Sequence, residues 1–476
     1  MSYALYVGAS HTADGHAWLA GYGDEPSGHW LELVPEGAHP PGATITVGMT
    51  PEADLPGRLS AIPQAPRTAR HLRVAYSWYK GAPAPLTNGG LNEHGVAVRD
   101  VWSPSRPELV AMTPPDQTGP TYSDLAKLVL ARARTAREGV DLIAATIATH
   151  GYSCYGGNSH LIADPSEAYV VVEFAGGKGL WVAERLGPDA IRASRPGHVG
   201  AIPREPTPDF LFPPHFVQTA IDLGWFDPAG DAPFDVNRVY GDGKGRWAGA
   251  AWIEAEMRAR AGRPEKIGFS DVVFAVATPK LTGDSAGYGQ IVPLVHPRDP
   301  ALRVLWHAPV GAVTAPLTPV FLGAEAIPPE YGPHRYLMRG EAGRFLDAPS
   351  PVVDEDAVSR VPQAAETARG AVAIHRRLMH LAFQAPDPLL QELWTHWRGL
   401  EARLDAELPD VARSAEILLE AGERRLATRL LTDHVETRMR RALDDAEALA
   451  EACAARLPFL APPHAGSLPR GPERIW

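Results

Sequence analysis

The sequence predicts an α+β protein, because stretches with strand character and stretches with helix character follow one another in separate blocks. Residues 1–110 show short apolar runs separated by turn residues, whereas residues beyond about 355 show apolar positions at helical spacing. The chain has 476 residues, of which 45% are hydrophobic, so it can bury a sizeable core.

The N-terminal block predicts six strands, each bounded by glycine, proline or polar turn residues. They cover residues 3–7, 16–21, 30–34, 44–47, 74–78 and 96–101.

A helical stretch and a second β block follow. Leu125, Leu128 and Val129 recur at helical spacing, with Ser123 as the expected N-cap and breaks expected at Gly139 and Gly151. The segment 159–186 then predicts two strands joined by the loop AGGKG. Residues 203–233 are rich in proline and are expected to cross the surface, and residues 269–325 predict strands alternating with turns.

Composition excludes several classes of function. The formal charge is 45 − 56 = −11 and the basic residues are scattered, which disfavours nucleic acid and anionic membranes as partners. No apolar run of about 18 residues and no secretory signal is present, so a cytoplasmic location is expected. The two cysteines cannot form a disulfide framework.

Matches to known catalytic and cofactor motifs lack the flanking sequence or the spacing that these motifs require. GDSAG at 283–287 fits a nucleophile elbow around Ser285, but no apolar strand precedes it and a strand rather than a helix is predicted after it. GDGKGRWAG at 241–249 lacks the phosphate-loop spacing. No H-x-x-x-H or C-x-x-C pair occurs, so neither a metal nor a cofactor is expected. Cys154 near His150 is expected to be a packing residue, like Cys453.

Ser2 is a second type of candidate nucleophile. Methionine aminopeptidase removes Met1 when a small residue follows, and the new terminus would carry a hydroxyl and a free amine on one residue. That amine has an ordinary pKa of about 7.7 to 8.0, so a useful fraction is neutral near pH 7 and can act as a general base.

Several segments in constant order resemble the secernin-like cysteine dipeptidases, a family of N-terminal-nucleophile (Ntn) hydrolases. They span residues 1–335 and include VGASHTADGHAWLAGYGDE, GGLNEHGVAV, HLIADPSEAYVVVEFAGGKGLWVAERL and FDVNRVYG. The resemblance implies an αββα sandwich, two stacked antiparallel sheets between helical layers, over residues 1–350. A helical region over 351–476 would pack on it.

The resemblance also implies site residues. Ser2 stands where the family has its cysteine, Asp24 is retained from an arginine- and aspartate-containing segment, and Gly21 stands where the arginine is expected. Asn92 is then the candidate oxyanion donor, and Arg195 is a candidate to replace the missing arginine. His94, next to Asn92, is a candidate substrate-binding residue.

The sequence therefore predicts an amidohydrolase that cleaves a small peptide or acyl-amide through an acyl-enzyme on Ser2. Two alternatives stay open. A biosynthetic acyltransferase would pass the same acyl group to an amine, and a homologue without catalytic groups would serve as a binding or scaffold protein. A homo-oligomer is compatible with either.

Overall fold

Two antiparallel sheets form the centre of the computed structural model, which describes residues 2–23, 29–76, 81–83, 85–283, 285–333 and 369–460. The six-stranded sheet has the order β14-β1-β2-β18-β19-β20. Its strands are β14 (Ile191–Ser194), β1 (Tyr3–Val7), β2 (Ala17–Gly23), β18 (Tyr288–Leu294), β19 (Val304–Ala308) and β20 (Thr318–Phe321). The first strand of the chain is therefore an inner strand, with a partner on each side.

The eight-stranded sheet has the order β16-β13-β12-β11-β10-β9-β8-β3. Its strands are β16 (Phe210–Leu211), β13 (Trp181–Leu186), β12 (Ala168–Glu173), β11 (Asn158–Ala163), β10 (Ala97–Val101), β9 (Leu86–Asn92), β8 (His71–Tyr76) and β3 (His29–Val34). β1 packs against β10 and β11, and β2 packs against β10, so the two sheets are stacked face to face.

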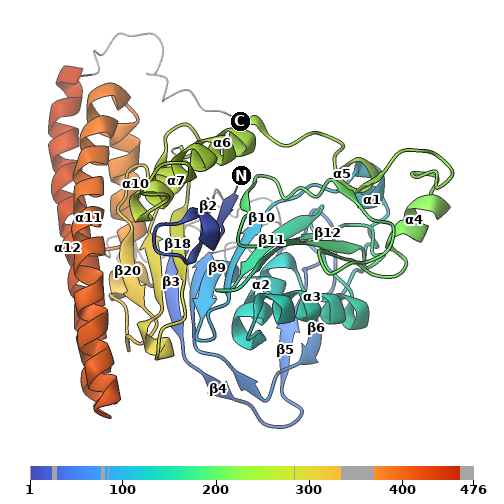
Figure 1. Cartoon of the computed structure of the whole chain (residues 1–476), viewed down its shortest axis with the longest axis horizontal. Helices are drawn as coiled ribbons and strands as arrows, with labels where there is room; N and C mark the ends of the chain where they lie inside the picture. The colour runs from blue at the N-terminus through green and yellow to red at the C-terminus, as the bar shows by residue number, and fades with distance from the viewer. Residues whose placement is uncertain are drawn as a thin grey trace, which may run out of the picture.

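Helices cover both outer faces (Figure 1). α2 (Tyr122–Arg132) and α3 (Ala136–His150) pack on the eight-stranded sheet, and α6 (Ala248–Ala261) and α7 (Phe269–Ala277) pack on the six-stranded sheet. The fold class predicted from the sequence is confirmed: the chain is α+β, with two stacked antiparallel sheets between helical layers.

Three C-terminal helices extend the layer on the six-stranded sheet: α10 (Ala371–Ala382), α11 (Pro386–Glu420) and α12 (Arg424–Leu460). Figure 1 shows α11 and α12 as two long helices side by side at the left edge. Leucines at a spacing of three or four residues and the buried Trp397 form the inner face of α11, and Trp397 Nε1 donates to the Thr314 carbonyl at 2.8 Å. Among the described residues, no helix is long and apolar enough to cross a membrane.

Several element boundaries differ from the sequence-based prediction. α2 begins after Thr121, whose side chain caps the helix together with Asp124, whereas Ser123 lies inside it. Gly139 lies within α3 and does not break it, and residues 269–277 form α7 rather than a strand. The expected stop at Gly151 is confirmed. The predicted domain boundary at 350/351 lies outside the described residues.

Candidate active site at the start of the first strand

Ser2 lies at the start of β1 and is only 5% exposed. Side chains alternate between the two faces of a strand, so Ser2 continues the row of Ala4 and Tyr6. Burial raises the pKa of Tyr6 to about 12, with the carboxylates of Asp164 and Glu167 adding to the shift. Both carboxylates belong to the β11–β12 turn region of the eight-stranded sheet, so this row faces the interior of the sandwich.

Polar side chains meet in that interior at the end where β1 starts, which we call the Ser2 end. Arg99 on β10 is fully buried. Its Nη1 donates to the Asn88 carbonyl at 2.7 Å and also contacts Asn88 Oδ1 and the Tyr288 hydroxyl. Its Nη2 donates to the Tyr22 carbonyl at 2.8 Å. The guanidinium therefore bridges the two sheets.

The Tyr22 carbonyl locates Arg99 relative to Ser2. The Gly23 carbonyl accepts from the amide of Gly287, just before β18, so the preceding carbonyl points the opposite way, toward β1. Tyr22 is paired with Tyr3, the residue after Ser2. The Arg99 guanidinium thus lies over the junction of β1 and β2, about one residue along and one strand across from Ser2.

Arg195, which follows β14, occupies the other face of the six-stranded sheet. Its guanidinium bonds the Tyr22 hydroxyl and lies 5.6 Å and 5.4 Å from the ring centroids of Tyr22 and Trp247. The Tyr22 hydroxyl itself donates to the Leu281 carbonyl beyond α7 at 2.7 Å. Arg195 is thus close to Ser2 along the sheet, but its side chain packs toward the α6–α7 layer.

The structure does not bring Asn92 to Ser2. Asn92 ends β9, at the opposite end of the sandwich, which we call the Asn92 end. Its Nδ2 donates to the carbonyls of Leu130 and Ala133 at 3.1 and 2.7 Å, and its Oδ1 accepts from the amides of His94 and Val96 at 3.0 and 2.9 Å. Both polar atoms of the side chain are occupied in holding a turn, so the predicted role as oxyanion donor is corrected.

His94 lies in that same turn and is likewise remote from Ser2. The turn is held by Arg303, which donates to the carbonyls of Glu93 and His94 at 2.9 and 3.2 Å. Burial lowers the pKa of His94. A substrate-binding role for His94 at the Ser2 site is therefore corrected as well. Asp24 lies outside the described residues.

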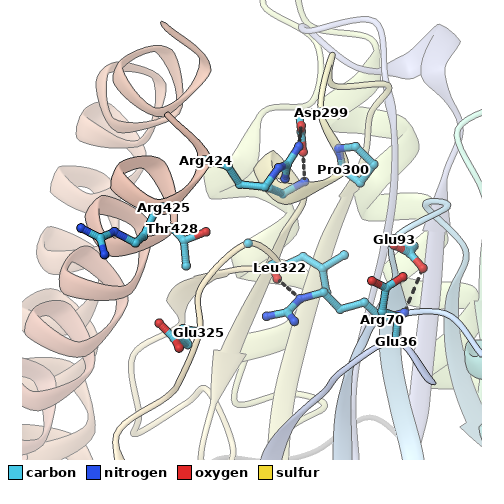
Figure 2. A pocket seen from close by; sticks show the side chains of 12 residues that line it. Glu36, Arg70, Glu93, Asp299, Pro300, Leu322, Glu325, Arg424, Arg425 and Thr428 are labelled. Carbon is cyan, nitrogen blue, oxygen red and sulfur yellow. Dashed lines mark hydrogen bonds and ion pairs between the residues drawn. The ribbon is translucent and has the colours of Figure 1, made fainter. Parts of the chain in front are cut away.

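The cavity of about 600 Å³ in Figure 2 also lies at the Asn92 end, between the first turns of α12 and the loop after β20. Several of the ionic and polar groups that line it are hydrogen-bonded to one another. Arg424 binds Asp299 at 2.6 Å, and Arg70 donates through Nε to the Leu322 carbonyl at 2.8 Å and through its amide to Glu93 at 3.0 Å. These pairings indicate a structural contact between the C-terminal helices and the sandwich.

A buried ion pair lies behind the site, on the face of the eight-stranded sheet toward α2. His160 Nδ1 is 2.8 Å from Glu173 Oε1, and its Nε2 is 2.9 Å from the Tyr122 carbonyl. Burial raises the pKa of Glu173. Burial opposes a charge on His160, but Glu173 outweighs it and the pKa of His160 is raised. This pair therefore holds a proton within the sheet.

The structure also places the other two candidate nucleophiles, Ser285 of the GDSAG motif and Cys154. Ser285 is exposed and is followed by β18, so no helix follows the GDSAG motif and the elbow is absent. Cys154 is buried, and burial raises the pKa of its thiol, which disfavours the thiolate that a nucleophile needs.

Sequence reasoning missed Arg99, Asn88 and Tyr288 at the site. Arg99 carried a usable signal, since an arginine in the alternating strand VAVRDV points either to solvent or to a partner inside the protein. Asn88 carried none, because LTNGG has the composition of a turn.

Comparison with known proteins gives a partial match. A model of peptidase family C69 matches residues 81–242, which begin before β9 and end after α5 (Val236–Val239). A search of curated proteins finds no significant match. A mutant and a variant of the conjugated bile acid hydrolase from Clostridium perfringens are structurally similar, with 11% and 10% sequence identity and TM-scores of 0.34 and 0.33. Each similarity covers 67% of this chain and 92% of the other.

Proposed function

We propose that the chain is an Ntn-type amidohydrolase that cleaves a small peptide or acyl-amide bond, with Ser2 as nucleophile. The position of Ser2 carries the proposal. It is a buried hydroxyl at the start of an inner strand, facing the interior of a two-sheet sandwich at the end where polar side chains gather. The match to a peptidase family over residues 81–242 supports the same class of reaction.

The proposed reaction has two steps. Ser2 Oγ attacks the substrate carbonyl, and its proton passes to the Ser2 amine, exposed by removal of Met1, and from there to the leaving nitrogen as the C–N bond breaks. Water then attacks the resulting ester and gives a proton to the same amine. The ester C–O bond breaks, and Ser2 recovers its proton.

Asn88 replaces Asn92 as our candidate amide donor to the oxyanion. It lies four residues earlier on β9, at the Ser2 end, and it is fully buried. Within the part of the chain that the structure describes, its Nδ2 has one long contact, 3.4 Å, to His29 Nε2. One donor of this type is worth about 10²–10³ in kcat. Arg195 is left out of this pocket, because its guanidinium packs against the Tyr22 and Trp247 rings on the other face of the six-stranded sheet.

The first experiment measures the mature N-terminus by intact mass and then the release of amine from a panel of dipeptides and N-acyl amides. Ser2→Ala should lower turnover at least about 10³-fold, and Ser2→Cys should retain it, because a thiol can replace the hydroxyl. Ser10→Ala is the matched control, since Ser10 is exposed in the same N-terminal segment. Retention of Met1, or full activity of Ser2→Ala, would contradict the mechanism.

A second candidate is a binding protein without catalytic activity. The placement of Asn92 and His94 at the far end favours it, because two of the predicted site residues are then absent from the site. No turnover in the wild type over the whole panel, with substrate binding preserved in Ser2→Ala, would support it.

Added hydroxylamine separates hydrolysis from acyl transfer, since an acyltransferase would form the hydroxamate at the expense of the free acid.

A further inference from the structure

The interior polar cluster contains a charge that the proposed reaction has not yet used. Arg99 is 0% exposed, and the described acceptors of its hydrogen bonds are neutral: two carbonyls, an amide oxygen and a hydroxyl. Its Nε is buried without a hydrogen-bond partner in the described part of the chain. Burying a guanidinium whose hydrogen bonds go to neutral groups, with the Asp100 carboxylate at 3.6 Å and so beyond hydrogen-bonding distance, is costly, and such a position points to a function for the charge.

Resting on the function proposed above, we infer that Arg99 is a positioning residue whose charge keeps the Ser2 amine unprotonated, and so available as the base, near neutral pH. The guanidinium lies over the β1–β2 junction because it donates to the Tyr22 carbonyl. From strand geometry the Ser2 nitrogen is about 7 Å away. At that separation a like charge in partly buried surroundings lowers the pKa of an amine by about one to two units.

Other charges also lie around Ser2. Arg195, on the opposite face of the six-stranded sheet, acts on Tyr3, the residue after Ser2. Asp100 is 3.6 Å from Arg99 and reduces its effect, but its carboxylate also acts on His160, on the far side of the sheet. On the opposite face of the six-stranded sheet, Glu254 of α6 is bound by Arg246 and Arg258, next to Arg195. Among the described residues, the further titratable groups at this end include Tyr3, Tyr22, Tyr288, His29 and the pair of His160 with Glu173.

The geometry also explains how a guanidinium reaches this position without an arginine on β2. Gly21 pairs with Gln290 and with Ala4, so the interior face of β2 carries no side chain there. A Cβ at Gly21 would collide with the Tyr3 carbonyl, so a side chain is excluded at that point of β2. The charge comes instead from β10 of the opposite sheet, across the interface.

The test is the pH dependence of sulfonylation of Ser2 by phenylmethanesulfonyl fluoride, followed by intact mass, which requires no knowledge of the substrate. The rate should rise through the pKa of the amine. We expect the wild-type midpoint about one unit below the ordinary 7.7 to 8.0. Arg99→Met should raise the midpoint by about one unit, and Arg99→Lys, which keeps the charge, should leave it within about 0.3 units.

Two further variants keep the test decisive. Asp100→Asn preserves shape and removes the opposing charge, so it should lower the midpoint, and it gives the answer if Arg99→Met does not fold. Arg303→Met, which removes the cross-sheet arginine at the Asn92 end, is the matched control and should leave the midpoint unchanged.

Failure of the proposed function and failure of the inference about Arg99 give different results in this experiment. Equal labelling of Ser2→Ala would refute the proposed function, whatever Arg99 does. Labelling confined to Ser2, with the same midpoint in wild type and Asp100→Asn and in any folded Arg99→Met, would overturn the inference and leave the proposed function standing.

Discussion

The two ends of the sandwich are each tied by one buried arginine, and the two arginines come from opposite sheets. At the Asn92 end, Arg303, the residue directly before β19, reaches three backbone carbonyls, those of Val295, Glu93 and His94. At the Ser2 end, Arg99 reaches from β10 to Tyr22. Arg303 has every nitrogen in a hydrogen bond, whereas Arg99 has not.

The same contrast extends to the neighbouring side chains. Ser194 Oγ and Gln290 Oε1 at the Ser2 end are buried without hydrogen-bond partners within the described residues. Asn92 at the other end makes four hydrogen bonds. Buried polar groups in proteins are normally satisfied, so the unmatched Ser194 Oγ and Gln290 Oε1 mark places at the Ser2 end where a ligand or water can bind. Within the described residues, His16 Nε2 and Trp18 Nε1 at the other end of β2 are unmatched too, so the contrast is one between these two side chains and Asn92.

The largest expected effects come from replacing each of the two asparagines of β9 by alanine. Asn92→Ala leaves two amides and two carbonyls without partners inside the protein, so we expect the free energy of unfolding to fall by about 3–4 kcal/mol. Turnover per folded molecule should not change. Urea unfolding and active-site titration measure the two quantities separately.

Asn88→Ala is the matched variant on the same strand. It should lower turnover by about 10²–10³-fold. The comparison of the two ends would be wrong if Asn92→Ala abolished turnover in folded protein and Asn88→Ala did not.

Histidines at the two ends should give opposite pH dependences of stability. At the Asn92 end, burial lowers the pKa of His71 from 6.5 to about 4. The unfolded chain then binds a proton that the folded chain does not, so stability is lost as pH falls below 6.5, by about 1.4 kcal/mol per unit and about 3 kcal/mol in all. His71→Asn should remove this loss in urea unfolding between pH 4 and 7.

At the Ser2 end the pH dependence of stability has the opposite sign. The pKa of His160 and that of its partner Glu173 are both raised, so the folded pair holds a proton that the unfolded chain releases. Its stabilisation is present below the unfolded pKa and is lost as pH rises through the folded pKa. The double variant His160→Gln/Glu173→Gln should abolish that alkaline loss, whereas His160→Gln alone should not, because burial keeps the pKa of Glu173 raised. If the His71 and His160 substitutions changed the pH dependence of stability with the same sign and size relative to the wild type, the two ends would not differ electrostatically.

The smallest expected effect is that of Arg303→Met. Water can reach part of this site, since Arg303 is 8% exposed, and it can replace some of the lost donors. We expect a loss of about 2 kcal/mol in urea unfolding, with turnover unaffected. A loss of turnover in folded Arg303→Met would show that this arginine acts on the reaction as well.

Local pattern predicted much of the fold. The predicted bounds of β1 and of β5 (Thr44–Val47) agree with the structure, because alternation within a strand is a local property. β9 was not predicted, since its residues 88–90 have turn composition. The structure explains its two glycines: a Cβ at Gly89 would collide with Gln290 Oε1, and one at Gly90 would collide with the Leu72 carbonyl. The contacts that select glycine there come from other strands.

The start of α2 also depends on a contact that the local sequence does not reveal. Thr121 and Ser123 are both suitable caps, and the sequence does not choose between them. The Ser123 hydroxyl accepts from the Thr87 amide of β9 at 2.6 Å, so it serves the sheet, and Thr121 is left to cap α2. A contact between residues 36 positions apart decided the boundary.

The α+β class, many of the strands, the C-terminal helices and Ser2 as a candidate nucleophile could all be predicted from local sequence patterns. Which polar residues accompany Ser2 depends on how the strands and sheets pack. Asn92 and Asn88 are four residues apart on β9, about 13 Å along the strand, and Arg195 and Ser2 face opposite sides of one sheet. Strand periodicity specifies that side chains alternate, but strand direction and sheet stacking assign each to an end and a face.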